Sequence, residues 1–218
     1  AAQPAAARAW PVMGLKDIEA MLCAPGQRFE METVTIRGVP TRTWKHAPSD
    51  LVALLRFSRG WGERLFVILE DDRVSYEGFH RAVATLAAEF RRRGVAKGDR
   101  VAIAMRNLPE WPVALFASAA CGAIAVPLNA WWTGAELEYA LADSAARLIV
   151  CDGERYERIA PHLAALPGLT DILVARGSAG QGEPLAGILG APNDWAALPD
   201  LPLPDVAIAP DDDATIFY

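Results

Sequence analysis

Val101-Ala-Ile-Ala-Met105 and Ala123-Ile-Ala-Val126 are two short apolar runs that decide the fold of this chain. Each run has the length and the β-branched content of a buried strand. The segment between them contains Pro109, which suits the start of a helix, and ends at Gly122, which suits its termination. A strand, a helix and a second strand in this order predict a right-handed βαβ unit with parallel strands.

The same alternation extends on both sides of this unit. Before it, Ser75 can cap a helix whose apolar side chains recur at helical spacing. After it, Thr133 and Glu136 form a capping box at the start of another helix. A further strand, helix and strand are predicted at 148–150, 154–166 and 172–174. The pattern predicts an α/β fold, a doubly wound parallel sheet with helices on both faces, in which the strands at 101–105, 123–126 and 148–150 are parallel neighbours.

Four segments follow from the patterning along the chain. They are an N-terminal leader with a short strand or hairpin (1–48), a parallel α/β subdomain (49–175), a Pro/Gly-rich crossing (176–210) and a terminal strand (211–218). Alternation over 29–36 indicates the strand of the leader, and Ser49 is the expected cap of a helix over 51–59. The crossing has six prolines from Pro184 to Pro210 and no apolar period, so we expect it to run over the surface. Because the last segment is an apolar strand, we expect the chain to be part of a longer protein.

Charge excludes one class of partner. The chain has 218 residues and a net charge of −6, and the segment 176–218 carries all of it, with one basic and seven acidic residues. A neutral body with an acidic end argues against binding to nucleic acid, which needs clustered Lys and Arg. The one basic run, 91–93, is expected to be a solvated helix end.

An uncharged stretch from Trp111 to Ala135 is long enough to span a membrane. Gly122 and Pro127 interrupt it, however, so a buried helix followed by a buried strand explains the same composition. We therefore expect no transmembrane segment.

Cysteine usage indicates a reducing compartment. Cys23, Cys121 and Cys151 are too few and too far apart for a disulfide framework or a zinc site. Two of them lie in apolar surroundings, where a buried thiol is the usual finding. No signal peptide is visible, and a cytoplasmic protein is expected.

Familiar catalytic constellations are absent from the sequence. The histidines His46, His80 and His162 are scattered, and the last two are expected on the surface. The glycine fingerprint of a dinucleotide-binding fold and the Walker loop are both missing, which argues against a Rossmann dehydrogenase. We expect no catalytic residue and no metal ligand in this chain.

Two loops follow strands at the edge where parallel sheets bind ligands. They are 106–110 and 127–132, and the second carries Trp131 and Trp132 ahead of a helix N-terminus. An N-terminus attracts anions and an exposed indole can stack a base or pack an acyl chain. Packing between subdomains is the alternative role for both tryptophans.

Five blocks in this order resemble the N-terminal part of the AMP-forming acyl-CoA synthetases, the adenylate-forming superfamily. They are Val74-Ser-Tyr76, Gly94-Val-Ala-Lys-Gly-Asp-Arg-Val-Ala-Ile103, Asn107-Leu-Pro-Glu-Trp111, Gly122-Ala-Ile-Ala-Val-Pro-Leu-Asn129 and Glu136-Leu-Glu-Tyr-Ala-Leu-Ala-Asp-Ser144. The last residues, Asp212-Asp-Ala-Thr-Ile-Phe-Tyr218, resemble the strand that runs into the family's Ser/Thr/Gly-rich phosphate loop.

This resemblance implies a ligase that uses ATP, Mg²⁺ and coenzyme A. A carboxylic acid, expected to be a fatty or similar hydrophobic acid, first forms an acyl-adenylate and pyrophosphate, and the thiol of coenzyme A then displaces AMP. In the family the groups that carry adenylation follow the equivalent of Tyr218. The chain is therefore expected to be the first subdomain, to need a second subdomain and a C-terminal domain as partners, and to be inactive and to bind no cofactor by itself. A homodimer is a further expectation.

The resemblance also implies one binding site. In acetyl- and medium-chain members, the nucleotide end of coenzyme A lies on the loop matching Asn129, Ala130 and Trp131, with arginines one helix later, where this chain has Arg155 and Arg158. Those relatives have a small residue at the position that matches Trp131. Surface charge without a ligand is the alternative for both arginines.

A second reading of the whole chain remains open. It is a free-standing, non-catalytic α/β module that binds a partner through the Trp131 and Trp132 loop.

Overall fold

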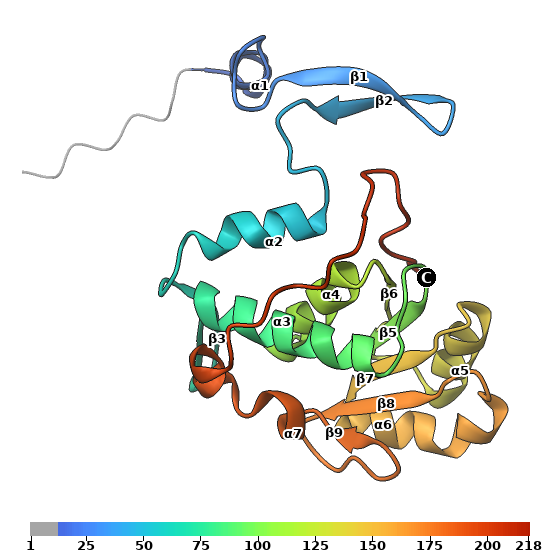
Figure 1. The fold of residues 1–218 in the computed structure, drawn as a ribbon. Helices are drawn as coiled ribbons and strands as arrows, with labels where there is room; N and C mark the ends of the chain where they lie inside the picture. Colours follow the sequence, from blue (N-terminus) through green and yellow to red (C-terminus); the bar gives the residue numbers. More distant parts are fainter. Residues whose placement is uncertain (1–12) are drawn as a thin grey trace, which may run out of the picture. The chain divides into compact units, whose positions relative to one another are not determined.

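The computed structural model describes residues 13–218 (Figure 1). Contacts within the chain divide it into two units, 1–48 and 49–218, and the division falls between Pro48 and Ser49. Each unit is described by itself.

The first unit is built around a β-hairpin. Helix α1 (Leu15–Leu22) precedes strands β1 (Met31–Ile36) and β2 (Val39–Trp44), which pair antiparallel. The turn between the strands places Arg37 and Gly38 at φ of 48° and 82°. Two consecutive positive φ values belong to the type of turn whose twist matches a hairpin.

A five-stranded parallel sheet forms the centre of the second unit. Its strands lie in the order β6-β5-β7-β8-β9, and every neighbouring pair is parallel. Their bounds are β5 (Arg100–Ala104), β6 (Ile124–Pro127), β7 (Leu148–Asp152), β8 (Asp171–Ala175) and β9 (Glu183–Pro184). The prediction that the strands at 101–105, 123–126 and 148–150 are parallel neighbours is confirmed, since β5 lies between β6 and β7.

Helices cover both faces of this sheet, as the doubly wound prediction requires (Figure 1). Side chains of β5 alternate between two cores: Val101 and Ile103 pack with α3 (Tyr76–Arg92) and α4 (Glu110–Ala120). Ala102 and Ala104 pack with α5 (Gly134–Asp143) and α6 (Gly153–Ile159) on the opposite face. The alternation follows from the two-residue period of a strand.

Helix starts follow the predicted caps with one correction. The Ser75 hydroxyl accepts from the Gly78 amide, and Thr133 forms the complete capping box with Glu136. Helix α2 (Leu51–Arg59), however, is capped by Asp50, whose carboxylate accepts from Ala53 N at 2.8 Å. Ser49 instead donates its hydroxyl to Asp50. An ionised carboxylate is the stronger acceptor at a helix N-terminus.

The helix predicted over 154–166 is shorter in the structure. It ends at Ile159 and continues as the 3₁₀ helix η1 (Ala160–Ala165). Pro161 has no amide hydrogen and cannot make an α-helical bond at that position. Ahead of α3, β3 (Leu65–Leu69) and β4 (Asp72–Ser75) form the antiparallel pair that the sequence indicates.

The crossing from 176 to 210 is not confined to the surface, and that expectation is wrong. It contains β9, a short helix α7 (Ala186–Leu189) and the 3₁₀ helix η2 (Pro192–Ala197). Leu185, Leu189 and Trp195 are each only 1% exposed and belong to the core shared with α3 and α4. Elements of two to six residues are too short to show a hydrophobic period.

The segment 211–218 joins the sheet by a single bridge rather than as a full strand. Thr215 pairs in parallel with Ala125 of β6. The Ala125 amide donates to Ala214 O and the Ile216 amide donates to Ala125 O, each at 3.0 Å. Two hydrogen bonds place this segment beside β6 at the edge of the sheet.

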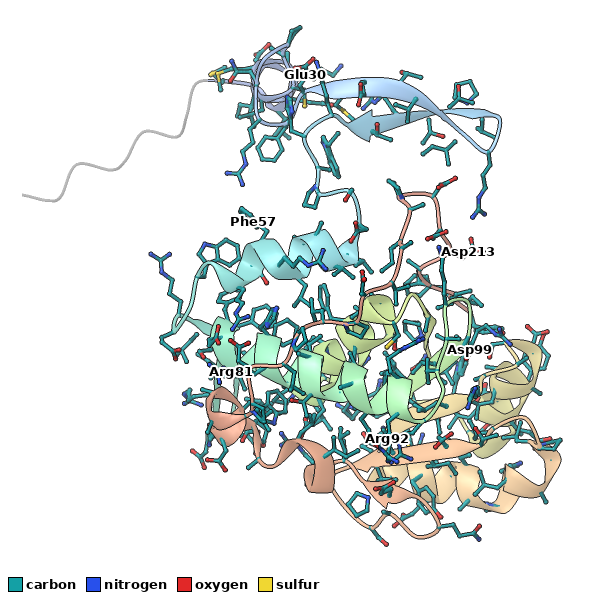
Figure 2. All side chains as sticks on the ribbon, in the orientation of Figure 1. Glu30, Phe57, Arg81, Arg92, Asp99 and Asp213 are labelled. Atoms are coloured by element: carbon teal, nitrogen blue, oxygen red, sulfur yellow. The ribbon has the colours of Figure 1, made fainter. Side chains whose placement is uncertain are left out.

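The basic run 91–93 is only partly a solvated helix end. Arg92, labelled in Figure 2 on the last turn of α3, has a side chain 69% exposed. The Arg93 side chain is 11% exposed and binds Asp171 at 3.0 Å, so it ties α3 to the start of β8. Its ion pairs replace the water that a solvated end would bind.

Candidate functional site

The loops that follow β5 and β6 enclose a groove of about 430 Å³ at the carboxyl edge of the sheet. The first loop leads to α4 on one face and the second leads to α5 on the other. Where neighbouring parallel strands send their chains to opposite faces, a crevice opens between the loops, and α/β proteins bind ligands there. Its lining includes Met105, Arg106, Asn107, Trp111, Asn129, Ala130, Trp131 and Tyr218.

An exposed tryptophan from one loop and an arginine from the other stack on each other in this groove. Trp131 is 68% exposed, and the guanidinium carbon of Arg106 lies 4.1 Å from the centre of its ring. The side chain of Asn129 accepts from the Trp131 amide at 2.9 Å and so fixes the local turn. This arrangement offers a flat aromatic surface with a cation stacked on it.

The two tryptophans of the loop differ in burial and in the residues that they contact. Trp132 is half-buried and lies next to Tyr218, with ring centres 6.3 Å apart. Together with Tyr139 and neighbouring residues these rings line a separate hollow of about 380 Å³. Packing therefore accounts for Trp132, whereas Trp131 faces the groove.

Both arginines predicted for the coenzyme A site reach the loop after β6, but they bind its backbone. Arg155 Nε donates to Ala130 O at 2.7 Å, and Arg158 Nη1 donates to Trp132 O at 2.7 Å. Arg155 is 1% exposed, so the alternative that it is a surface charge is wrong. The structure thus brings Asn129, Ala130, Trp131, Arg155 and Arg158 together, with the arginines behind the loop.

Asp152 is the residue that sequence reasoning missed. Its carboxylate caps α6 by accepting from Arg155 N at 3.0 Å and binds the Arg155 guanidinium at 3.0 Å. It also accepts from Arg106 N at 3.0 Å, so one side chain ties together the loop after β5 and the helix after β7. The available signal was an acidic residue at the end of a buried strand, directly before a helix.

The histidines differ from their expected placement. His162 is half-buried and pairs with Glu138 on α5. His80 is 5% exposed, so the expectation that it lies on the surface is wrong. The His80 side chain faces α2 and the segment 200–203 rather than solvent. These two elements cover the polar side of α3, which the sequence pattern predicts to be exposed.

Residues 13–218 contain neither a cluster of metal ligands nor a membrane-spanning helix. No three His, Cys, Asp or Glu side chains lie together in a way that could hold a metal ion. No helix in this range has both the length and the apolar character needed to cross a bilayer, and the uncharged stretch at 111–135 forms α4, β6 and the loop that follows.

The buried thiols give a testable expectation. Burial raises the pKa of Cys121 and of Cys151 to about 12, so neither is a thiolate at neutral pH. In the folded chain at pH 8 we expect Ellman's reagent to titrate one thiol rapidly, the partly exposed Cys23. In urea all three thiols should react. Because the folded pKa is raised, the stability contributed by the neutral thiols is present below the unfolded pKa of about 8.5 and is lost as the pH rises towards 12. Rapid reaction of a second thiol in the native chain would contradict this.

Comparison with known proteins identifies the family of this chain. The family model described as AMP-binding enzyme matches residues 54–218. A 3-hydroxybenzoate–CoA/4-hydroxybenzoate–CoA ligase of Thauera aromatica is 30% identical over 164 residues, 74% of this chain and 30% of that protein. The medium/long-chain-fatty-acid–CoA ligase FadD6 of Mycobacterium tuberculosis is 31% identical over 100 residues, 46% of this chain and 17% of that protein.

Solved structures agree with the architecture. The apo structure of MbtA from Mycobacterium smegmatis has a TM-score of 0.67 and 25% identity, over 78% of this chain and 31% of that chain. The chain spans less than a third of the length of these three proteins. The sheet order, the helices on both faces and the match over 54–218 lead to one conclusion: the chain belongs to the AMP-binding enzyme family and corresponds to the N-terminal portion of its acyl-CoA ligase-like, adenylate-forming members.

Proposed function

We propose that this chain is the N-terminal portion of an ATP-dependent ligase that joins a carboxylic acid to coenzyme A. The carboxylate attacks the α-phosphorus of ATP, and pyrophosphate leaves. The sulfur of coenzyme A then attacks the acyl carbon, its proton is lost and AMP leaves. The observation that carries the proposal is the family match over residues 54–218, which covers most of the chain.

The substrate is proposed to be a fatty or similar hydrophobic acid. Relatives with this family's sequence act, by their names, on medium- and long-chain fatty acids, on hydroxybenzoates and on 4-hydroxybutyrate. Among these relatives, the medium/long-chain-fatty-acid–CoA ligase FadD6 supports the hydrophobic end of that range.

In this proposal the chain shapes one side of the coenzyme A site. The loop 129–131 would meet the nucleotide end of coenzyme A, with the exposed face of Trp131 available to an adenine ring. Arg155 and Arg158 would act by holding that loop in place through its carbonyl groups, and Arg158, being partly exposed, could also meet a phosphate.

The direct test uses the protein extended beyond Tyr218. With ATP, coenzyme A and a panel of short, long and aromatic acids, we expect the acyl-CoA ester and one equivalent of AMP, detected by mass spectrometry and by nucleotide chromatography. Formation of ADP, or no ester with any acid, would refute the ligase. The second outcome would favour a non-catalytic module that binds a partner through the exposed Trp131.

Reversing the charge of Arg158 tests the coenzyme A site. In the extended protein we expect Arg158→Glu to raise the KM for coenzyme A about tenfold or more. The Trp132 carbonyl loses its arginine donor, the Ala130 carbonyl keeps only Arg155, and a nearby phosphate meets a like charge. ATP–pyrophosphate exchange, which needs no coenzyme A, should be unchanged. Arg92→Glu is the matched control, since Arg92 is an exposed helical arginine that pairs with Glu89 on its own helix. An unchanged KM in Arg158→Glu removes this assignment.

A further inference from the structure

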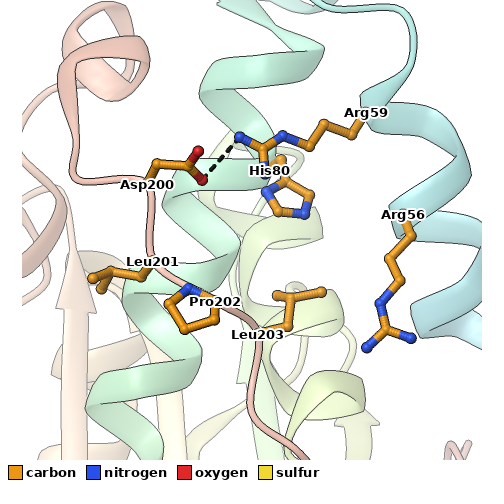
Figure 3. Close-up of a pocket in the computed structure, with 7 residues that line it drawn as sticks. All are labelled: Arg56, Arg59, His80, Asp200, Leu201, Pro202 and Leu203. Carbon is orange, nitrogen blue, oxygen red and sulfur yellow. Dashed lines mark hydrogen bonds and ion pairs between the residues drawn. The ribbon is translucent and has the colours of Figure 1, made fainter.

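Another cavity lies between α2, α3 and the segment 200–203. Its volume is about 520 Å³, and its lining consists of Arg56, Arg59, His80, Asp200, Leu201, Pro202 and Leu203. Figure 3 shows two arginines reaching from α2 towards the crossing segment, with the imidazole of His80 on α3 beside them. The family resemblance assigns no role to this place.

The two arginines stand one helical turn apart, and their engagement differs. Arg59 binds Glu77 through two hydrogen bonds, at 2.9 and 2.7 Å, and binds Asp200 at 2.8 Å. Within residues 13–218, Arg56 makes no side-chain hydrogen bond or ion pair, and the Asp50 carboxylate interacts with it only through its charge. The cavity therefore has one fixed cation and one cation with donors to spare.

The third polar group is a buried imidazole. His80 is 5% exposed and its Nδ1 has no hydrogen-bond partner. Leaving a buried polar atom unpaired costs free energy, so such an atom in a cavity wall indicates a missing partner. Burial, and then the charge of Arg59, hold the pKa of His80 below its usual value, although Glu77 and Asp200 oppose this and Arg56 adds to it.

We propose that this cavity binds an oxyanion of the phosphate type, with Arg56, Arg59 and His80 as its donors and Asp200 as an internal competitor. The three donors come from two helices, and arginine is well suited to bind the oxygens of a phosphate group. Leu201 and Leu203 form an apolar wall, so a phosphate monoester with an apolar body fits better than free phosphate.

The carboxylate of Asp200 competes with the anion for Arg59. Its side chain is 52% exposed, and an ion pair with this exposure contributes little to stability. A dianion can therefore displace Asp200 from Arg59, while Glu77, 17% exposed, keeps the arginine in position. The anion would then take the place of the Asp200 carboxylate at Arg59 and would also be held by Arg56.

The test is a titration of the full chain at constant ionic strength, with chloride as the replaced anion. The probes are inorganic phosphate, phenyl phosphate and acetate, and the signal is the ring proton of each histidine in NMR spectra. We expect His80 to shift saturably with phosphate and more tightly with phenyl phosphate. His162, which pairs with Glu138 on another helix, serves as the internal control. The chemical shift of its ring proton should not change at the phosphate concentrations that shift His80.

Variants make the proposal falsifiable. Arg56→Gln should weaken phenyl phosphate binding at least fivefold, Asp200→Asn should tighten it about threefold or more, and Arg92→Gln should leave it unchanged. Should Arg56→Gln not fold, the Asp200→Asn result decides. The proposal is overturned if His80 does not shift, if acetate binds as tightly as the phosphates, or if neither Arg56→Gln nor Asp200→Asn changes the affinity.

Discussion

The 218-residue chain by itself will catalyse no ATP–pyrophosphate exchange with any carboxylic acid, whereas the protein extended through the later domains will. Holding a triphosphate needs aligned amide donors or a cluster of cations. In the groove the cation is Arg106, which is already stacked on Trp131. The acidic run 211–213 supplies no cation to the groove either. It precedes the parallel bridge from Thr215 to β6 and so lies at the opposite edge of the sheet, where Asp212 pairs with Lys97 at 2.6 Å.

The expected difference is large. Alignment of two reactants in a cleft is worth about 7–11 kcal/mol, and that corresponds to a factor of about 10⁵ or more in rate. The measurement compares the chain, the extended protein and a blank without protein over short, long and aromatic acids. Exchange by the chain above the blank would mean that the adenylation site lies within these residues.

Replacing Trp195 by alanine will destabilise the folded second unit by about 3–5 kcal/mol, the range for removing a fully buried aromatic side chain. Trp195 is 1% exposed and packs in the core that α3 and α4 share. Its backbone also lies against Gly78, where an added Cβ would come within 3.1 Å of Ala196 N. The crossing therefore holds α3 through a tightly fitted contact.

Urea unfolding followed by circular dichroism measures this loss. Trp131→Ala is the matched control, because Trp131 is 68% exposed and its removal should change the free energy of unfolding by less than about 1 kcal/mol. If Trp195→Ala does not fold, Trp195→Phe should still fold with a smaller loss. Equal effects of Trp195→Ala and Trp131→Ala would show that the crossing does not support the core.

The central part of the fold could be predicted because each signal there is local. The runs at 101–105 and 123–126 are apolar enough to be buried on both faces, and the caps at Ser75 and Thr133 depend on residues three positions away. Parallel pairing then follows from chain connectivity. Solved relatives share this architecture.

What could not be predicted depends on contacts between distant segments. Trp195 and His80 become buried because the crossing folds back over α3. An element of six residues is too short for its hydrophobic pattern to predict such a contact. Arg155 resembles a surface arginine in sequence. It is buried because Asp152 and the carbonyl of Ala130 satisfy its guanidinium, and these partners become visible only once the loop is in place.

The shared carboxylate of Asp152 has a consequence for protein engineering. Grafting the loop 127–132 from a relative, in order to change what the groove accepts, moves a segment whose Ala130 carbonyl is held by Arg155. Arg155 is held by Asp152, and Asp152 also fixes the amide of Arg106 in the opposite wall. The two walls therefore form one transferable module. A chimera that exchanges one loop without its Asp152 and Arg155 partners inherits a mismatched groove, and one that exchanges all of them together keeps its geometry.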